Sequence, residues 1–349
     1  MKTIKVGIIG AGGMAHTHAS DFADLEGVVI TAVCDVDQER ASDFATRYGI
    51  SHVYRDSARL IREADVDAVS IVTPDRSHAP ITLDAVGAGL HTLCEKPLAT
   101  TVADAQEMAG AAMKAGLVNM VNFSYRRSSA LHAARRMIDE GRIGRLVHFE
   151  GHYLQSWLIS RAWGDWRTED RWLWRLSTER GSSGALGDIG VHLLDFVTFP
   201  AGDIEWVDCT LRTLPKADGA RMRGYKLDAN DSAVITASLS NGALGSLHLS
   251  RWASGHLNTI GMTLYGERGA LRIDLDQSWE TLWCCLGEDV EKSKWRRRTY
   301  KRGPSVIERF VRSIKRGNSE QPDFARGAYV QRLLQACFDS DLNRARVKI

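Results

Sequence analysis

The chain has 349 residues, of which 44% are hydrophobic and 25% are charged, and its net charge is +2. This length predicts two domains with sizeable cores, as in ordinary globular proteins. The balanced charge excludes a general attraction to nucleic acid or anionic membranes, and no apolar run reaches the length of a membrane span.

The six cysteines show no C-x-x-C spacing, so we expect no metal site. Cys34 and Cys94 stand at the ends of apolar runs, where buried free thiols are usual. A predicted strand follows Met1-Lys2-Thr3 directly, which leaves no room for a signal peptide. These features together predict a reduced, cytoplasmic protein.

Predicted strands and helices alternate over residues 1–123. We expect strands at residues 4–9, 28–34, 68–72, 91–94 and 118–121. Helices are expected between them, at residues 37–48, 79–88 and 102–115. Such alternation predicts parallel strand pairing with right-handed crossovers, and therefore an α/β domain with a doubly wound sheet.

A glycine-rich turn follows the first predicted strand. Gly10, Gly12 and Ala15 match the G-x-G-x-x-G/A spacing of dinucleotide-binding turns. Gly10 allows a tight turn, Gly12 lets backbone approach a pyrophosphate, and Ala15 lets the next helix pack closely. The start of that helix then offers N–H groups to the phosphates. The alternative is a flavodoxin-like turn that binds no dinucleotide.

Asp35 ends the second predicted strand, about 20 residues beyond the glycine turn, where the ribose-binding acid is expected. A carboxylate there accepts hydrogen bonds from a ribose 2′-hydroxyl and repels a 2′-phosphate. NAD is therefore favoured over NADP, although Arg40 lies close enough in sequence to approach a 2′-phosphate.

Two further motifs follow predicted strands, at the sheet edge where ligands bind in such folds. They are Val72-Thr73-Pro74, with His78 beyond it, and Glu95-Lys96-Pro97. A proline stops each strand and fixes its loop, which would hold Lys96 near a bound nicotinamide. The alternatives are a solvated loop lysine and, for His78, a buried structural histidine.

These motifs resemble the glucose–fructose oxidoreductase / inositol dehydrogenase / rhizopine catabolism (Gfo/Idh/MocA) family. The resemblance covers nearly the whole chain, and Glu-Lys-Pro at this distance from the glycine turn is fairly specific. It implies an NAD(P)-binding Rossmann domain at residues 1–123. The implied cofactor contacts are Gly10, Gly12, Gly13, Met14, Ala15, Asp35, Thr73, Pro74, His78, Glu95 and Lys96.

Mostly strands are predicted beyond residue 124. After a helix at 130–140, we expect strands at 146–154, 206–214, 233–239, 243–252, 259–265, 270–275 and 281–286, then helices at 305–315 and 326–342. This predicts an α+β domain at 124–349 with a large open, mainly antiparallel sheet. That domain is expected to bind substrate and to carry the oligomer contacts.

One face of that sheet is predicted to be less apolar, because Ser246 and His248 alternate with leucines. An open sheet needs a cover on its second face, and similar family members provide one with another subunit, so we expect a dimer or tetramer. The basic run at residues 292–302 predicts a solvated edge or loop. Recognition of a phosphorylated sugar is its alternative, and nucleic acid is disfavoured.

Five of the ten tryptophans lie between residues 157 and 174, interleaved with arginines. Aromatic faces stack on sugars and arginines donate to hydroxyls, which favours a substrate wall or a subunit contact. The alternative is a structural loop anchored by buried tryptophans. The substrate-binding residues expected here and elsewhere are Lys96, Arg126, Trp174, Arg175, Asp188 and His192.

Asp188, His192 and Asp195 would share one face of a helix, because they are four and three residues apart. An acid and an imidazole one turn apart suit a proton relay, with Asp195 orienting His192 from behind. An ordinary surface pair is the alternative. The stretch also resembles the family's second-domain signature, and the resemblance implies Lys96, Asp188 and His192 as the catalytic set.

The expected function is therefore an NAD-dependent dehydrogenase that oxidises a secondary hydroxyl of a sugar, an inositol or a sugar derivative. One alternative is a glycosidase that uses bound NAD for transient oxidation and elimination. Another is a non-enzymatic regulator that responds to NAD or a sugar. Accumulation of NADH distinguishes the first from the second, and a dispensable Lys96 and His192 would indicate the third.

Overall fold

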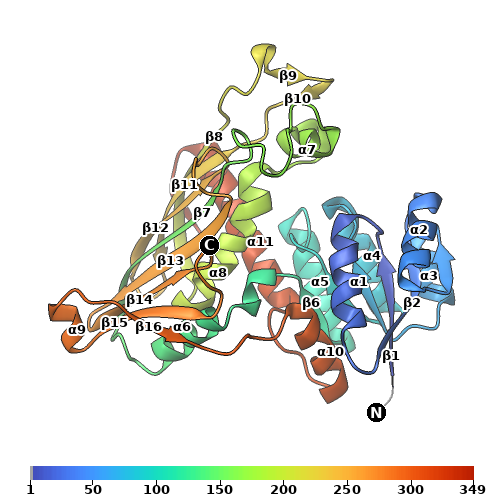
Figure 1. Ribbon diagram of the computed structural model, residues 1–349, viewed down its shortest axis with the longest axis horizontal. Coiled ribbons are helices and arrows are strands. Elements are labelled where there is room, and N and C mark those ends of the chain that lie inside the picture. Colours follow the sequence, from blue (N-terminus) through green and yellow to red (C-terminus); the bar gives the residue numbers. More distant parts are fainter. Residues whose placement is uncertain (1–2) are drawn as a thin grey trace. The chain divides into compact units, whose positions relative to one another are not determined.

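The computed structural model describes residues 3–349, which form two compact units (Figure 1). The first unit ends at Ser124 and regains residues 304–331, and the second comprises residues 125–303 and 332–349. The domain limits predicted from the sequence, 1–123 and 124–349, stay a prediction, and residues 304–331 lie with the first compact unit. The prediction about Met1 and Lys2 lies outside the described residues.

The first unit contains a six-stranded sheet in the order β3-β2-β1-β4-β5-β6. The strands are β1 (Ile4–Ile9), β2 (Val28–Cys34), β3 (His52–Tyr54), β4 (Ala68–Ile71), β5 (His91–Cys94) and β6 (Asn119–Val121). Every neighbouring pair is parallel, which confirms the doubly wound sheet. The short strand β3 was not expected from the sequence.

Helices connect these strands. They are α1 (Gly13–Ala23), α2 (Gln38–Tyr48), α3 (Ser57–Glu63), α4 (His78–Gly87) and α5 (Val102–Ala115). Side chains cap the starts of α2, α3 and α5. Asp37, Asp56 and Thr101 each accept a hydrogen bond from the backbone N–H three residues on. Helix α1 begins without such a cap.

Helix α10 (Val306–Arg316) explains why residues beyond 303 return to the first unit. Its apolar side packs Ile307 and Phe310 into the same core cluster as Val6 and Phe22. Ser305 and Glu308 form a capping box at its start. Because the core of the first unit buries this apolar stripe, the helix joins that unit although it lies far along the chain. Helix α11 (Phe324–Asn343) begins in the first unit and ends in the second.

The second unit contains a nine-stranded sheet in the order β16-β15-β14-β13-β7-β12-β11-β8-β17. Its strands are β7 (Leu146–Gln155), β8 (Ile204–Arg212), β11 (Ser232–Leu239), β12 (Leu244–Ser250), β13 (Asn258–Gly266), β14 (Gly269–Asp274), β15 (Thr281–Leu286), β16 (Arg296–Thr299) and β17 (Val347–Lys348). Strands β7 and β12 pair in parallel and the other pairs are antiparallel, which confirms the predicted sheet.

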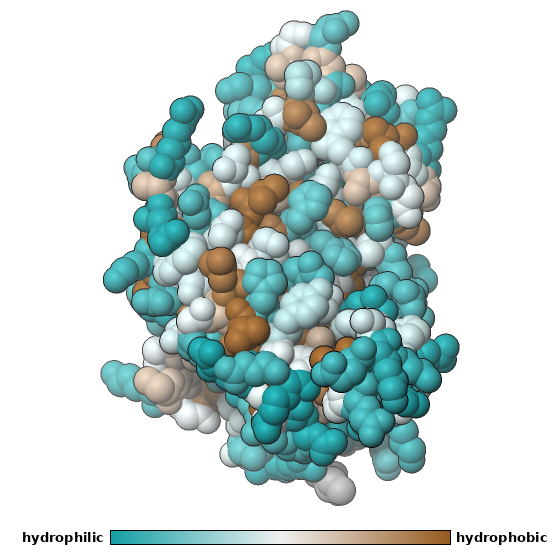
Figure 2. Space-filling model, turned by 90° about the vertical axis from the view of Figure 1, so that its left-hand side faces the viewer, coloured by the Kyte–Doolittle hydropathy of each residue, from teal (hydrophilic) through white to brown (hydrophobic). Residues whose placement is uncertain are grey.

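Helices α6 (Ser129–Asp139) and α8 (Val191–Ala201) lie on one face of this sheet (Figure 1). On the other face, Ser246 and His248 are exposed, as predicted, beside exposed Val234 and Leu244. Figure 2 shows apolar side chains interrupting the polar surface there. All four residues of edge strand β16 are exposed, which confirms the solvated edge.

Within residues 3–349, no helix combines the length and the apolarity needed to cross a membrane. The six cysteines of this part of the chain are buried free thiols.

Candidate active site

The glycine turn between β1 and α1 leaves an open space in front of the helix. Gly10 has φ +98°, and a Cβ there would lie 2.5 Å from the carbonyl oxygen of Val72, so this position requires glycine. A Cβ on Gly12 or Gly13 would meet nothing within 4 Å. The first N–H groups of α1, which starts at Gly13, therefore face space that an anion can enter.

Asp35 stands beside this turn at the end of β2, and its carboxylate is fixed by protein donors. The backbone N–H of Ala11 donates to Oδ2 at 2.8 Å, and that of Asp37 donates to Oδ1 at 3.0 Å. Arg40 adds a bidentate ion pair, with Nη2 at 2.6 Å and Nε at 3.1 Å. Burial opposes ionisation, but Arg40 and the two amides lower the pKa of Asp35 below its ordinary value.

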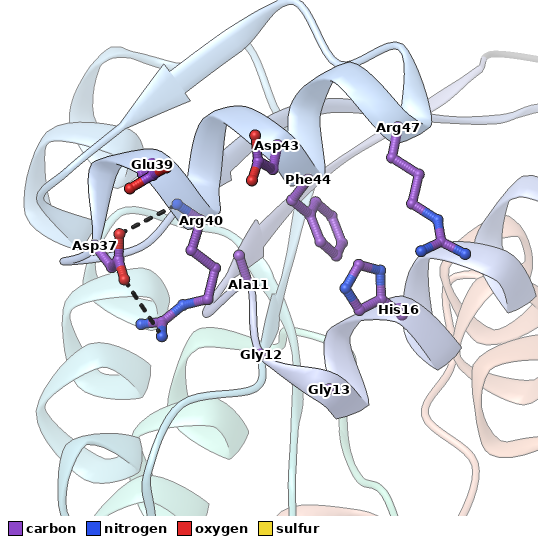
Figure 3. A pocket seen from close by; sticks show the side chains of 10 residues that line it. All are labelled: Ala11, Gly12, Gly13, His16, Asp37, Glu39, Arg40, Asp43, Phe44 and Arg47. Atoms are coloured by element: carbon purple, nitrogen blue, oxygen red, sulfur yellow. Dashed lines mark hydrogen bonds and ion pairs between the residues drawn. The ribbon is translucent and has the colours of Figure 1, made fainter.

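A cavity of about 510 Å³ lies between the starts of α1 and α2 (Figure 3). Its lining residues are Ala11, Gly12, Gly13, His16, Asp37, Glu39, Arg40, Asp43, Phe44 and Arg47. An uncapped helix start, two open glycines and an ionised acid together fit a dinucleotide, with phosphates at α1 and ribose toward Asp35.

Glu95 ends strand β5 and anchors the loop that carries Lys96. Its carboxylate accepts a hydrogen bond from Asn122 Nδ2 at 2.6 Å and lies 2.9 Å from His18 Nε2. Burial would raise the pKa of Glu95, but His18 and Asn122 lower it to about 2. A buried, fully bonded Glu95 holds the loop in place. Direct contacts of Glu95 and Lys96 with a cofactor stay predictions.

His78 ties the two strand-end loops together. Its Nδ1 lies 2.8 Å from the carbonyl oxygen of Pro97, and its Nε2 lies 2.9 Å from that of Thr73. Both nitrogens therefore face acceptors. Burial disfavours the charge, but Cys94, Asp75 and the carbonyl of Pro97 raise the pKa of His78 to about 10. The ring is fully buried, so it positions Thr73-Pro74, and a direct contact with the cofactor stays a prediction.

Asp188 lies on a π-helical turn, Leu186–Gly190, that precedes α8. One continuous α-helix was expected, and a π turn inside a helix is frequent at functional sites. Its carboxylate accepts a hydrogen bond from Arg251 Nη2 at 2.9 Å. The Arg251 side chain is 0% exposed and that of Asp188 is 30% exposed, so a fixed buried cation supports an accessible anion. Arg251 follows strand β12 and was not predicted from the sequence as a site residue.

His192 lies on α8 against two tyrosines that the sequence analysis did not assign. The Tyr125 ring stands edge-on to the imidazole, with centroids 5.0 Å apart, and the Tyr153 ring lies 6.4 Å away. The Tyr125 and Tyr153 hydroxyls are 2.5 Å apart. Asn258 Nδ2 donates to Tyr125 at 3.1 Å, and its Oδ1 accepts from Tyr153 at 2.9 Å.

This ring of three side chains is self-consistent, because each group both donates and accepts. Burial raises the pKa of Tyr153 well above its ordinary value, so the phenol stays neutral. Strand register brings Tyr153 of β7 close to Asn258 of β13, since Gln155 of β7 pairs directly with Asn258. No local sequence motif signals this network, because its members are more than 25 residues apart.

Arg126 is placed differently from the expectation that it binds substrate. Its guanidinium makes two hydrogen bonds of 2.6 Å to Asp195 and lies 3.7 Å from the centroid of Phe199. The side chains of this pair are 1% and 3% exposed. Arg126 thus forms a buried ion pair, and its contact with substrate stays a prediction. Asp195 is engaged by this arginine, and its predicted role behind His192 stays a prediction.

The tryptophan-rich segment at residues 157–174 has a buried part, as in a structural loop, and an exposed part, as in a substrate wall. Trp157 and Trp166 are buried in a cluster with Leu158 and Leu176, as in a structural loop. Trp174 is 40% exposed, and the Arg175 guanidinium lies 4.5 Å from its centroid. This outer part remains open to a ligand, so the substrate contacts of Trp174 and Arg175 stay predictions.

The structure thus gathers the predicted site residues within each unit. Gly10, Gly12, Asp35 and the loop of Lys96 belong to the first unit. Asp188 and His192 belong to the second, on consecutive turns.

The parallel sheet, the open helix start and the fixed acid define a dinucleotide-binding protein of the Rossmann class. The chain belongs to the GFO/IDH/MocA oxidoreductase family. Residues 4–123 match the family model described as "Oxidoreductase family, NAD-binding Rossmann fold", and residues 131–272 match the GFO/IDH/MocA C-terminal domain. The protein is an oxidoreductase, and its cofactor is NAD.

Levoglucosan dehydrogenase from Pseudarthrobacter phenanthrenivorans is 28% identical over 394 residues, which cover 100% of this chain and 99% of that protein. A solved structure of levoglucosan dehydrogenase in complex with NADH and levoglucosan matches with a TM-score of 0.89 and 27% identity, over 100% of this chain and 99% of that one. A glycosyl hydrolase family 109 protein from Shewanella woodyi is 31% identical over 187 residues, covering 48% of this chain and 39% of that protein.

Proposed function

We propose that this protein is an NAD-dependent dehydrogenase that oxidises a secondary hydroxyl of a sugar or polyol. The observation that carries the proposal is the pairing, on consecutive turns of one segment, of an accessible carboxylate and an imidazole. The carboxylate of Asp188 is held by Arg251, and the Tyr125 ring packs edge-on against His192. Such groups suit hydroxyl recognition and proton removal.

Each side chain has a distinct task in this mechanism. When bound, NAD accepts a hydride from the carbinol carbon. His192 takes the hydroxyl proton, since imidazole titrates near neutral pH. Lys96 donates a hydrogen bond to the reacting oxygen and stabilises its developing charge. Asp188 accepts a hydrogen bond from a neighbouring hydroxyl, because its carboxylate is accessible and is held in place by Arg251.

A likeness over the full length of levoglucosan dehydrogenase makes anhydrosugars the first substrates to test. The experiment incubates the purified protein with NAD and a panel of anhydrosugars, aldoses, inositols and glycosides, and follows NADH absorbance. We expect NADH to accumulate with at least one member of the panel. Absence of NADH with every member would contradict the proposal.

The glycosidase alternative is favoured by one comparison, the partial match to a glycosyl hydrolase family 109 protein. Its products distinguish it from a dehydrogenase, because transient oxidation regenerates NAD and releases a free sugar. Chromatography of the glycoside reactions checks this directly. Cleavage of a glycoside without accumulation of NADH would replace the dehydrogenase with this alternative.

We also propose that a second copy of the chain covers the exposed face of the nine-stranded sheet, giving a dimer or tetramer. Val234 is 55% exposed and Leu244 is 45% exposed on neighbouring strands of that face. A cytoplasmic location is part of the same proposal, and the six free buried thiols agree with a reducing compartment.

A further inference from the structure

Tyr125 packs against both the imidazole of His192 and the indole of Trp279. Its ring centroid is 5.0 Å from that of His192, with the planes at 87°, and 5.4 Å from that of Trp279, with the planes at 29°. Edge-on and stacked contacts are the arrangements that aromatic rings prefer. The guanidinium of Arg127 lies 4.6 Å from the centroid of the same indole and adds a cation–π contact. The Tyr125 ring is therefore held by an aromatic neighbour where it contacts the candidate base.

Trp279 lies in the loop between β14 and β15, yet hydrogen bonds to its backbone fix its position. Its carbonyl oxygen accepts one from Ser128 Oγ at 2.7 Å and one from the backbone N–H of Ala130 at 3.2 Å. Ser128 caps α6 and Ala130 lies in the first turn of that helix, directly after the turn that carries Tyr125. The loop and the turn are thus joined, which keeps the indole stacked on the phenol.

The hydroxyl end of Tyr125 is fixed by a second set of contacts. It accepts a hydrogen bond from Asn258 Nδ2 at 3.1 Å and lies 2.5 Å from the Tyr153 hydroxyl. Asn258 Oδ1 also accepts from Gln155 Nε2 at 2.8 Å, and Gln155 Oε1 accepts from Trp157 Nε1 at 3.1 Å. Apart from Asn258, these side chains belong to buried residues, so water competes little for the bonds. A chain of hydrogen bonds therefore connects the tryptophan-rich segment with the phenol.

The direction of the His192 ring matters, because an imidazole takes up a proton only at its ring nitrogens. A histidine side chain rotates about two bonds, and packing decides which rotamer it keeps. The Tyr125 ring lies against the imidazole, and the Tyr153 ring centroid is 6.4 Å from it. Tyr125 is 8% exposed and its hydroxyl is bonded inside the protein, so this residue acts on the imidazole and not on substrate.

We propose that Tyr125 is a positioning residue for His192. The indole of Trp279 and the hydrogen bond from Asn258 fix the phenol, and the phenol fixes the plane of the imidazole. The inference rests on the proposed function, in which His192 takes the hydroxyl proton. Other groups hold the substrate, Asp188 among them. Loss of the phenol ring therefore slows the chemical step and leaves substrate affinity largely intact.

The test measures kcat and KM by NADH formation for wild type, Tyr125→Phe, Tyr125→Leu and Trp279→Leu with the best substrate of the panel. Tyr125→Leu removes the ring, and we expect kcat to fall about thirtyfold with KM within about twofold of wild type. Tyr125→Phe keeps the ring and should keep kcat within about threefold. Trp279→Leu, which releases the phenol, should lie between them. Tyr300→Leu is the control, because the Tyr300 ring packs near the Arg136 guanidinium instead, and both constants should hold.

Three results would overturn the inference: a wild-type kcat in folded Tyr125→Leu, a loss confined to KM, or a Tyr125→Phe protein as slow as Tyr125→Leu. Thermal melting verifies folding. If Tyr125→Leu does not fold, Trp279→Leu carries the test, and a kcat equal to that of wild type contradicts the proposal.

The same series separates this inference from the proposed function. A wild-type protein that forms NADH and requires His192, together with an indifferent Tyr125, would remove the positioning role and leave the dehydrogenase in place. A wild-type protein that forms no NADH, or one whose turnover survives His192→Ala, would overturn the proposed function and the inference with it.

Discussion

Asp188 and Glu95 are both carboxylates near motifs of the candidate site, yet their surroundings give them opposite tasks. Glu95 is buried: its Oε1 contacts His18 and Asn122, and its Oε2 accepts a hydrogen bond from the backbone N–H of Lys96. Asp188 keeps an accessible side chain, and its Oδ2 forms an ion pair with Arg251. Glu95 therefore shapes a loop, and Asp188 is suited to contact substrate.

Replacing Arg251 with lysine tests the support of Asp188. Arg251 donates to Asp188 at 2.9 Å and to the carbonyl of Arg175 at 3.2 Å. The single ammonium group of a lysine cannot make both hydrogen bonds in this geometry. We expect kcat/KM to fall about tenfold, chiefly through a higher KM, since substrate alignment is lost. Arg272→Lys, a change on strand β14 of the same sheet, is the control and should leave both constants unchanged.

The Glu95 ion pair predicts a pH dependence of stability. Because the pKa of Glu95 is lowered from 4.5 to about 2 in the folded protein, its contribution is complete above pH 4.5 and is lost as the pH falls toward 2. Glu95→Gln should lower the free energy of unfolding by about 2 kcal/mol at pH 7 and by much less at pH 3. Urea unfolding measures both values.

The exposed Glu107 on α5 provides the control for that series. Glu107→Gln should follow wild type at each pH. A Glu95→Gln deficit that is the same at pH 3 as at pH 7 would mean that the carboxylate charge contributes nothing.

At the scale of elements, the strand–turn–helix unit β1–α1 was predictable and the turn before α8 was not. The glycine pattern specifies a backbone path directly, since only glycine, which lacks a Cβ, suits the φ of +98° at position 10 next to Val72. In the π turn at residues 186–190, a Cβ on Gly190 would lie 2.9 Å from side-chain carbons of both Leu186 and Leu249, so this close packing requires glycine. The distant leucine is invisible in a local pattern.

Two alanine substitutions separate folding from cofactor binding in the glycine turn. Gly10→Ala places a Cβ 2.5 Å from the carbonyl of Val72, so it should lower stability by about 2 kcal/mol or more. Gly12→Ala meets nothing within 4 Å, so stability should hold while NAD affinity falls about tenfold. Thermal melting and calorimetry check the pair. Equal NAD affinity for Gly12→Ala and wild type would remove the pyrophosphate from this turn.

At the scale of the whole molecule, the sequence predicted both sheets but not the division of the chain. Strand alternation is local, so five of the six parallel strands and the order of the domains follow from it. Helix α10 belongs to the first unit because its apolar stripe packs into that unit's core, where Phe310 and Phe22 share one cluster. The sequence alone does not show which core this stripe enters. Long-range partners such as Arg251 for Asp188 are unpredictable for the same reason.

Assembly is tested by a charge on the exposed face of the nine-stranded sheet. If a second copy covers Leu244, then Leu244→Glu should reduce the mass measured by light scattering to that of a monomer, because the buried charge is costly. Met113→Glu, at a 79% exposed position on α5, is the control and should leave the mass unchanged. A monomeric wild-type protein would contradict the proposed assembly outright.

The central claim is that Lys96 and His192 act on one hydroxyl while NAD is bound. The most direct measurement compares wild type, Lys96→Ala and His192→Ala for NAD affinity by calorimetry and for turnover of the best substrate by NADH formation. The account predicts NAD affinity within about threefold of wild type and turnover lower by about a hundredfold or more in each variant. Turnover unchanged in either variant, with NAD still bound, would contradict it.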